Sequence, residues 1–347
     1  MSQRENVNPR REQDHRKNSR RYQKRAAARR RRNTIFIVEI VLLLILAVVL
    51  FFMSKLSKIE KTKLDMDKIE VNEDISQESQ KIMKGYQTIA MFGLDNRSNG
   101  NLSQGRSDVI MLANINNDTK EVKLVSVYRD TYLDTGDGIF QKCNAAYAKG
   151  GPEQAISMLN VNLDLNITDY VTVDFNSIIE CVDLLGGVDM EITDDEASLM
   201  TGYIRELNEL TGNKAENLTQ GGTYTLNGVQ ACAYARIRYG GGDDYRRTER
   251  QRTVLTAMVK KAQQSDLTTV NKLINEVCGD IQTSFSNAEL LALASQVFQY
   301  SIGDTTGFPF TKTTKVLSKK TGDVVIPCDL SDNVKELHIF LYEDSAY

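Results

Sequence analysis

Residues 234–252 read YARIRYGGGDDYRRTERQR, and the other motifs of the chain are interpreted in relation to this stretch. It carries six arginines around the glycines Gly240–Gly242 and the neighbouring Asp243 and Asp244. An arginine side chain keeps its charge at physiological pH, and its planar fork fits two oxygens of a phosphate. Glycine lets the backbone approach a ligand closely. The stretch therefore predicts a polyphosphate clamp, with a solvated basic helix face as the alternative.

Two of these arginines stand at the end of a predicted helix. Residues 226–237 (LNGVQACAYARI) are typical of a buried helix, and Arg236 and Arg238 alternate around Ile237. In a continuing helix the two side chains would point about 200° apart, whereas an extended exit puts them on one side. We therefore expect the helix to end by residue 235 or 236, with both guanidinium groups facing one ligand.

A second helix is predicted over residues 246–261. Arg247, Arg250 and Gln251 stand at positions i, i+3 and i+4 of this segment. Residues with this spacing share one face of a helix, so we expect the three side chains to meet the same ligand.

Charged residues also stand beside predicted strands. Apolar runs typical of strands cover residues 88–92, 109–114, 122–127, 170–175 and 188–192. Loops at the carboxyl ends of strands are where α/β sheets keep their sites. The charged residues next to the first three runs are Asp95, Arg97, Arg106, Asp108, Arg129 and Asp130. Asp130, and Asp174 at the end of the fourth run, are expected to orient an arginine or cap an element.

The remaining apolar runs predict helices that cover a sheet. Helices are expected after Pro152 and over residues 178–185, 194–212 and 290–297, the second ending at Gly186–Gly187. Residues 324–326 and 337–341 are expected to be strands or docking segments. The fold class is therefore α/β, with a mixed central sheet flanked by helices.

The charge distribution divides the chain. The first 33 residues hold 13 Lys+Arg and 3 Asp+Glu, a net charge of +10, and the remaining 314 residues carry a net charge of −13. Between them, residues 34–53 (TIFIVEIVLLLILAVVLFFM) contain a single charge and are long enough to span a bilayer as a helix. The basic end should stay inside. We expect one N-terminal transmembrane helix, a cytoplasmic N-terminus and an extracytoplasmic domain in the cell membrane.

This topology gives a provisional domain organisation. Residues 1–33 form a basic tail, 34–53 the transmembrane helix, 54–84 a polar stalk and 85–347 the extracytoplasmic domain, with a motif core at 85–261 and an extension at 262–347. A cleaved signal peptide fits less well, because the apolar run is long and no small-x-small site follows it. The basic tail could bind nucleic acid unspecifically, but topology accounts for it, and no nucleic acid partner is expected.

The chemistry open to the chain is narrow. Its two histidines, His15 and His338, have no matched partners, and its five cysteines show no CxxC spacing, which argues against a Ser-His-Asp hydrolase and a zinc site. Cys278 and Cys328 could pair. Carboxylates, arginines and a lysine suit phosphoryl transfer, which depends mostly on positioning and charge. Mg²⁺, or Mn²⁺ in its place, is the expected cofactor, with Asp95 and Asp108 as its carboxylate ligands.

The motifs together resemble the LytR-CpsA-Psr family. They run in order and with family-like spacing over about residues 85–261, and read GLDNR (93–97), RSD (106–108), SVYRDT (126–131), KCNAAYAKGG (142–151), VDF (173–175), LGGV (185–188), LNGVQACAYARIR (226–238) and DYRRTERQR (244–252). Two residues depart from the usual pattern: Tyr128 replaces a proline, and Cys143 replaces an aliphatic residue.

The resemblance implies a function and a set of site residues. Members of the family are membrane-anchored enzymes that transfer an anionic glycopolymer, such as wall teichoic acid or capsular polysaccharide, from a polyprenyl pyrophosphate carrier to peptidoglycan. Asp95 and Asp108 would bind Mg²⁺, and Asp244 would be the candidate base. The residues implied to bind or support the pyrophosphate are Arg106, Arg129, Lys142, Arg236, Arg238, Arg247 and Gln251.

Two other functions remain open from the sequence. A hydrolase could cleave the same pyrophosphate with water, because the motifs do not show a sugar acceptor site. A non-catalytic envelope-binding or regulatory protein is a more distant alternative, because such a protein need not keep both metal carboxylates together with Asp244.

Overall fold

The computed structural model describes residues 60–61, 64–94, 102, 105–238, 243–266, 269, 272–273, 281–319 and 321–343. All of them belong to one compact unit, residues 55–347. The expected basic tail and the expected transmembrane helix at 34–53 lie outside the described residues. Within the described part, no helix combines the length and the apolar character needed to cross a membrane.

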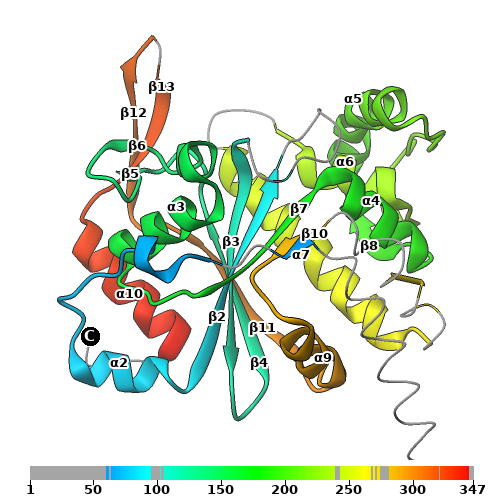
Figure 1. Ribbon diagram of the computed structural model, residues 1–347. Helices are drawn as coiled ribbons and strands as arrows, with labels where there is room; N and C mark the ends of the chain where they lie inside the picture. Colours follow the sequence, from blue (N-terminus) through cyan, green and yellow to red (C-terminus); the bar gives the residue numbers. More distant parts are fainter. Residues whose placement is uncertain are drawn as a thin grey trace, which may run out of the picture. The chain divides into compact units, whose positions relative to one another are not determined.

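A mixed sheet of seven strands forms the centre of this unit (Figure 1). Strands β2, β4, β7 and β11 run in one direction, and β1, β3 and β10 run in the other. In their order across the sheet the strands are β1 (Glu60–Lys61), β10 (Ile281–Thr283), β7 (Asp169–Asp174), β2 (Tyr86–Leu94), β3 (Ser107–Asn116), β4 (Glu121–Val127) and β11 (Ser301–Phe308).

Three two-stranded sheets lie outside the central sheet. They are β5 (Tyr132–Asp134) with β6 (Phe140–Lys142), β8 (Val188–Ile192) with β9 (Gly222–Leu226), and β12 (Lys312–Ser318) with β13 (Gly322–Pro327). The third is joined to the first through the backbone, since Val325 N–H donates to Asp130 O over 2.9 Å.

Helices cover both faces of the central sheet (Figure 1). The helices are η1 (Met66–Lys68), α2 (Gln77–Met83), α3 (Ala145–Leu163), α4 (Phe175–Leu184), α5 (Asp194–Thr211), α6 (Gly228–Arg236), α7 (Asp243–Gln264), α9 (Asn287–Ser295) and α10 (Leu330–Tyr342). Apolar residues of α3 and α10 pack on one face of the sheet, and those of α7 and α9 pack on the other. A separate cluster joins α4, α5, α6 and the antiparallel pair β8–β9 to α7.

Side chains placed before the helices fix where they begin. Thr193 and Glu196 form a capping box at the start of α5, and Asn227 and Gln230 form another at the start of α6. Asp174 caps α4 by accepting the Ser177 N–H over 2.9 Å, the capping role expected for it. These caps decide where each helix meets the end of its strand.

Residues 64–84, the larger part of the expected polar stalk, are packed into the domain. Ile69, Ile75 and Met83 are buried in the core against α3, although their neighbours are polar. Glu70 N–H donates to Ser157 Oγ over 3.1 Å. The compact unit therefore begins well before residue 85, because a few widely spaced aliphatic residues are enough to anchor this segment.

One further expectation is corrected. Residues 337–341 lie in helix α10, whose buried Val334, Leu337, His338 and Leu341 have helical spacing. The span of α3 consists of two helices that meet at a kink, because Gly150 and Gly151 have non-helical backbone angles, and the second helix begins at Pro152 as expected.

Candidate active site

The expected site residues gather where β2, β4 and β7 end and β3 begins. Because β2, β4 and β7 are parallel, their carboxyl ends meet at one edge of the sheet. Asp108 stands at the start of β3 on the same edge, and Arg129 and Asp130 follow β4 directly. Sequence reasoning placed these charged residues together, and the sheet explains why.

A basic pocket of about 210 Å³ opens at this edge. Helix α6 ends at Arg236, and Ile237 has extended backbone angles of φ −52° and ψ 127°. Arg236 and Arg238 therefore both reach the pocket, which confirms the predicted extended exit. The residues lining the basic pocket are Asp108, Arg129, Phe175, Tyr203, Arg236, Arg238, Arg247 and Gln251.

Helix α5 holds the two arginines of the exit in place. The guanidinium group of Arg236 lies 5.4 Å from the ring centroid of Phe175 and 5.9 Å from that of Tyr203. Glu206 accepts a hydrogen bond from Arg236 Nη2 over 3.1 Å. The Tyr203 hydroxyl accepts the backbone N–H of Arg238 over 3.2 Å. Sequence reasoning missed Tyr203 and Glu206, although their i, i+3 spacing puts them on one face of a predicted helix.

A network of charged groups links Arg247 to the rest of the site. Asp244 Oδ1 lies 2.7 Å from Arg247 Nη2 and 3.8 Å from Arg129 Nε. Arg129 Nη1 donates to Asp108 Oδ1 over 2.9 Å. Asp244 therefore stands between two arginines in this conformation, and its Oδ2 is buried without a hydrogen-bond partner among the described residues.

Arg247 is incompletely neutralised. Its side chain is only 3% exposed, and its Nε and Nη1 atoms have no hydrogen-bond partner among the described residues. Burial lowers the pKa of Arg247 to about 10; Asp244 opposes this shift, while Arg129 and Arg238 add to it. Buried donors without acceptors are rare in proteins, so an anion is the expected partner.

The pKa of Arg129 is shifted in the opposite direction from that of Arg247. Burial lowers its pKa, but the carboxylates of Asp108, Asp130 and Asp244 more than offset that effect, so the pKa is raised above its ordinary value. Arg129 is thus held as a cation by neighbouring carboxylates.

A larger polar cleft of about 690 Å³ adjoins the basic pocket and shares Asp108 and Arg129 with it. Lys142 Nζ lies 2.8 Å from Asp130 Oδ1. Arg129 Nε lies 3.4 Å from Asp130 Oδ2, which agrees with the expectation that Asp130 orients an arginine. The other residues lining the polar cleft are Arg106, Gln141, Asn144, Ala145 and Thr321.

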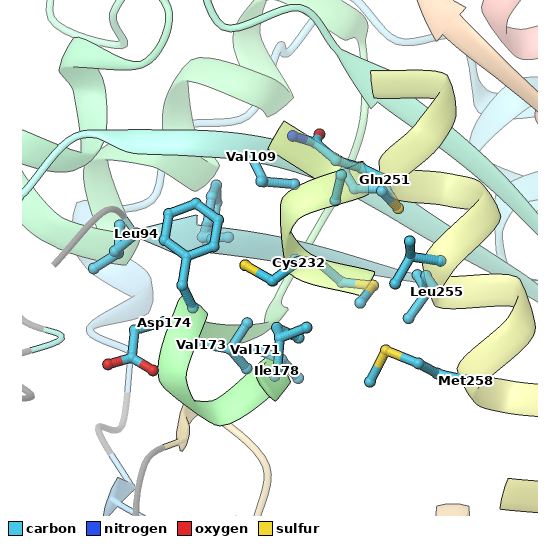
Figure 2. Close-up of a pocket in the computed structure, with 17 residues that line it drawn as sticks. Leu94, Val109, Val171, Val173, Asp174, Ile178, Cys232, Gln251, Leu255 and Met258 are labelled. Atoms are coloured by element: carbon cyan, nitrogen blue, oxygen red, sulfur yellow. The ribbon is translucent and has the colours of Figure 1, made fainter. Parts of the chain in front are cut away.

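An apolar pocket lies on the other side of the basic pocket, between the sheet and helices α4, α6 and α7. Figure 2 shows Cys232 and Met258 directed into it, with the carboxylate of Asp174 turned away. Phe175 and Gln251 line both this pocket and the basic pocket. Apart from Gly93, its other lining residues are aliphatic, aromatic or sulfur-containing core types. Some of them, such as Leu94 and Val173, lie in the motifs quoted above, but residues of these types do not reveal a pocket in a sequence.

Arg250 does not join the other residues of its predicted helix face. Its Nε donates to Glu196 over 3.1 Å, and its Nη1 donates to Ile237 O over 3.4 Å, so it braces α7 against α5 and the end of α6. The expectation that it lines the ligand site is corrected, because its direction from the helix axis differs from that of Gln251 by about 100°. Arg247 and Gln251 do share the basic pocket.

The two departures from the family pattern are accommodated locally. Tyr128 packs edge-on against Tyr245, with ring centroids 4.5 Å apart, and Lys312 Nζ lies 4.9 Å and 4.6 Å from the two rings. A Cβ on Gly307 would come within 2.2 Å of the Tyr128 hydroxyl, so this tyrosine needs a glycine opposite it. Cys143 Sγ donates to Tyr128 O and Arg129 O over 3.2 Å and 3.3 Å.

Some predicted site residues fall outside the described part of the chain. These are Asp95 and Arg97; the glycine segment at residues 240–242 and Cys278 also lie outside it. Among the described residues, no group of three or more His, Cys, Asp or Glu side chains is arranged to hold a metal ion.

Known proteins with similar sequences support the family resemblance described above. A relative from Enterococcus faecalis (strain ATCC 700802 / V583), polyisoprenyl-teichoic acid–peptidoglycan teichoic acid transferase TagU, is 30% identical over 210 residues, which cover 60% of this chain and 64% of the relative. The chain thus matches less than two thirds of that relative's length.

Solved structures share the fold. The structure of TagT bound to LI-WTA has a TM-score of 0.62 at 21% identity, covering 82% of this chain and 100% of the other. TagT with bound octaprenyl pyrophosphate lipid has a TM-score of 0.57 at 21% identity, covering 81% and 99%. The LytR_cpsA_psr family model matches residues 46–315, most of the sequence and all of the motifs described above. This chain therefore belongs to the LytR_cpsA_psr family.

Proposed function

We propose that this protein transfers an anionic glycopolymer, of the wall teichoic acid or capsular polysaccharide kind, from a polyprenyl pyrophosphate carrier to peptidoglycan. Family membership supports the proposal, as do the name of the TagU relative and the octaprenyl pyrophosphate bound by TagT.

The observation that carries the proposal is the order of the three cavities. The apolar pocket meets the basic pocket at Phe175 and Gln251, and the basic pocket meets the polar cleft at Asp108 and Arg129. A polyprenyl pyrophosphate glycan has the same order of parts: an apolar tail, a dianionic linkage and a sugar. The carrier can therefore place its tail in the apolar pocket, its pyrophosphate in the basic pocket and its first sugar at the inner end of the polar cleft, which leaves the mouth of the cleft open.

The arginines of the basic pocket have distinct proposed roles. Arg236 and Arg238 clamp the pyrophosphate, and Arg247 supplies the buried donors that lack a partner in the described residues. Arg129 stands between the basic pocket and the polar cleft, beside the phosphorus that is transferred. Charge that develops on phosphate oxygens is stabilised most strongly by such prearranged cations.

We propose that Mg²⁺ assists the reaction, held by Asp95 and Asp108. Leu94 and Ser107, which precede these two aspartates, are register partners in the sheet. Mg²⁺ commonly takes only one or two carboxylates and completes its shell with phosphate oxygens and water. When bound, it would neutralise phosphate charge; Arg129, already hydrogen-bonded to Asp108, would orient that carboxylate.

We propose that Asp244 accepts the proton of the attacking hydroxyl. Its Oδ1 is anchored by Arg247, and its Oδ2 makes no hydrogen bond with a described residue. The geometry thus leaves one anchored and one unpaired oxygen, an arrangement compatible with general base catalysis. Asp244→Asn would keep the shape and remove the basic oxygen, so it should lower the transfer rate without weakening carrier binding.

A reconstituted assay distinguishes the transferase from the rival hydrolase. Purified protein is incubated with a polyprenyl pyrophosphate-linked saccharide, Mg²⁺ and peptidoglycan, and both the peptidoglycan-linked product and free phosphorylated saccharide are measured. We expect the linked product to dominate and to depend on Arg236 and Arg247. Free saccharide phosphate as the only product, at all peptidoglycan concentrations, would favour the hydrolase. Failure of the protein to act on the carrier would favour the non-catalytic alternative.

A further inference from the structure

The mouth of the polar cleft carries features that the pyrophosphate does not use. Asn144 lines the cleft, is only 5% exposed, and its side-chain amide makes no hydrogen bond with a described residue. A buried amide offers two donors and an acceptor. Neither polar atom of the Asn144 amide is among the buried atoms that lack a partner, so the amide is accessible from the cleft, where a neutral polar ligand can reach it.

An aromatic surface lies next to this amide. On the β5–β6 hairpin, Tyr132 is the register partner of Lys142, which lines the polar cleft. Residues two apart on a strand share one face, so Phe140 stands on the face of Lys142. Phe140 is 54% exposed, and its ring centroid lies 6.0 Å from that of Tyr132. The two rings therefore stand beside Gln141 and Lys142, the residues of this hairpin that line the cleft.

The C-terminal hairpin also contributes to the cleft. Thr321, between β12 and β13, lines the same cleft and is held by a 3.0 Å hydrogen bond from its N–H to Ser318 Oγ. The hairpin is fixed to the site through the bond from Val325 N–H to Asp130 O. The cleft thus joins neutral hydrogen-bonding groups to an apolar platform, a combination that suits the polar edges and apolar faces of a sugar ring.

The geometry of the reaction indicates whether the mouth of the cleft binds a sugar of the carrier or a sugar of the acceptor. Attacking and leaving oxygens lie roughly in line in phosphoryl transfer. The hydroxyl oxygen of the acceptor forms a bond to the sugar-bearing phosphorus, and the bond from that phosphorus to the polyprenyl phosphate oxygen breaks. The polyprenyl phosphate leaves with the electron pair, and the hydroxyl proton goes to Asp244. Because the tail lies in the apolar pocket, the acceptor must enter from the other side, through the polar cleft.

We infer that Asn144, Phe140 and Tyr132, together with Thr321, form the docking surface for the glycan strand of the peptidoglycan acceptor. This inference rests on the proposed function. The Asn144 amide binds a sugar hydroxyl or acetamido group, and the Phe140–Tyr132 pair stacks against a ring face.

The test uses the full chain and a soluble peptidoglycan tetrasaccharide of alternating N-acetylglucosamine and N-acetylmuramic acid. Its Kd is measured by calorimetry for the wild type, Asn144→Ala, Phe140→Ala and the conservative Phe140→Tyr. Phe298→Ala is the matched control, because Phe298 is 59% exposed and does not line the polar cleft. We expect the two alanine variants in the cleft to bind about ten-fold more weakly, a change of 1.4 kcal/mol at 25 °C. Phe140→Tyr and Phe298→Ala should bind like the wild type.

A thermal shift with octaprenyl pyrophosphate accompanies each variant. A retained shift shows that the variant is folded and that its carrier site is intact, so weaker tetrasaccharide binding then supports the inference. Unchanged tetrasaccharide affinity in both Asn144→Ala and Phe140→Ala would overturn it.

A third arm separates the acceptor from the sugar of the carrier. Binding of saccharide-bearing carrier is compared with binding of octaprenyl pyrophosphate alone. If the variants weaken only the saccharide-bearing carrier, the surface holds the donor sugar and the inference is wrong. Loss of tetrasaccharide binding in the variants, combined with hydrolysis and no transfer by the wild type, would overturn the proposed function and leave the docking surface standing.

Discussion

Arg247 is a buried cation with too little counter-charge around it. Its partner Asp244 is shared with Arg129, and two of its nitrogen atoms have no acceptor among the described residues. Sites that bind anions are often unfavourable for the empty protein, so function and stability oppose each other at this residue.

We expect Arg247→Met to leave the ligand-free protein folded, with a free energy of unfolding within about 2 kcal/mol of the wild type, because the removal of a buried charge with two donors unpaired among the described residues offsets the loss of the ion pair with Asp244. The same variant should lose the stabilisation that octaprenyl pyrophosphate gives the wild type. Denaturant unfolding with and without the lipid measures both effects. Arg246→Met is the control: Arg246 is exposed, so its replacement should change stability by less than about 0.5 kcal/mol. A destabilised Arg247→Met that still responds to lipid would contradict the prediction.

Arg238 tests whether the clamp depends on shape as well as charge. Lysine keeps the charge and loses the planar fork, so Arg238→Lys should reduce transfer ten-fold or more if the fork contributes about 1.5–3 kcal/mol. Transfer of lipid-linked saccharide to peptidoglycan is compared for the wild type, Arg238→Lys and Arg238→Ala. Lysine activity equal to that of the wild type would mean that charge neutralisation is sufficient. Wild-type activity in the alanine variant would remove Arg238 from the site.

At the scale of elements, the position of α6 depends on a close contact with α4. A Cβ built on Gly228 would lie 2.1 Å from Ile179 O, so α6 can approach α4 only with glycine at this position. Because α6 ends in Arg236, this contact helps to place the pyrophosphate clamp.

Gly228→Ala should therefore lower the free energy of unfolding by about 1–3 kcal/mol and weaken carrier binding, since α6 must move. Gly202→Ala in α5 is the matched control. Nothing lies within 4 Å of a Cβ at Gly202, so alanine should stabilise that helix by about 0.5–1 kcal/mol. Thermal unfolding of both variants tests this prediction, and equal stabilities of the two variants would contradict it.

Local patterns predicted most of the core elements. The runs at 88–92, 109–114 and 122–127 became β2, β3 and β4, because period and turn residues agree with burial there. Strand β11 was missed: SIGDTTGF contains two glycines and an aspartate, and it is a strand because it pairs with β4. Helix α10 had helical spacing that was overlooked in a short apolar run.

The site was predictable only where its chemistry is carried by charged motifs. The residues Asp108, Arg129, Arg236 and Arg238 follow from strand ends and from the alternation around Ile237. The positions of Tyr203, Phe175 and Asn144 in the site could not be predicted in this way. The contact between an aromatic ring and an arginine, and an amide without a partner among the described residues, both arise from tertiary packing. Arg250 shows the converse: correct helical spacing did not reveal that Glu196 lies opposite it.

At the scale of the whole molecule, the proposal requires the domain to stand outside the membrane. We expect protease added to intact cells to degrade the chain after Met53 and to leave the first 33 residues protected, because the lysine and arginine bias should hold that end inside. Epitope tags at both ends, followed by immunoblotting, report the two halves separately, and lysed cells serve as the control. A protected C-terminal tag in intact cells would contradict the proposed topology.

The apolar pocket and the polar cleft have no lining residue in common among the described residues and meet only through the basic pocket. Carrier and acceptor would then enter through separate openings, so the enzyme can bind both substrates at the same time. The steady-state kinetics should accordingly be sequential: reciprocal-rate plots that vary both substrates should intersect. Parallel lines would indicate a ping-pong course, in which the enzyme itself carries the glycan between two half-reactions.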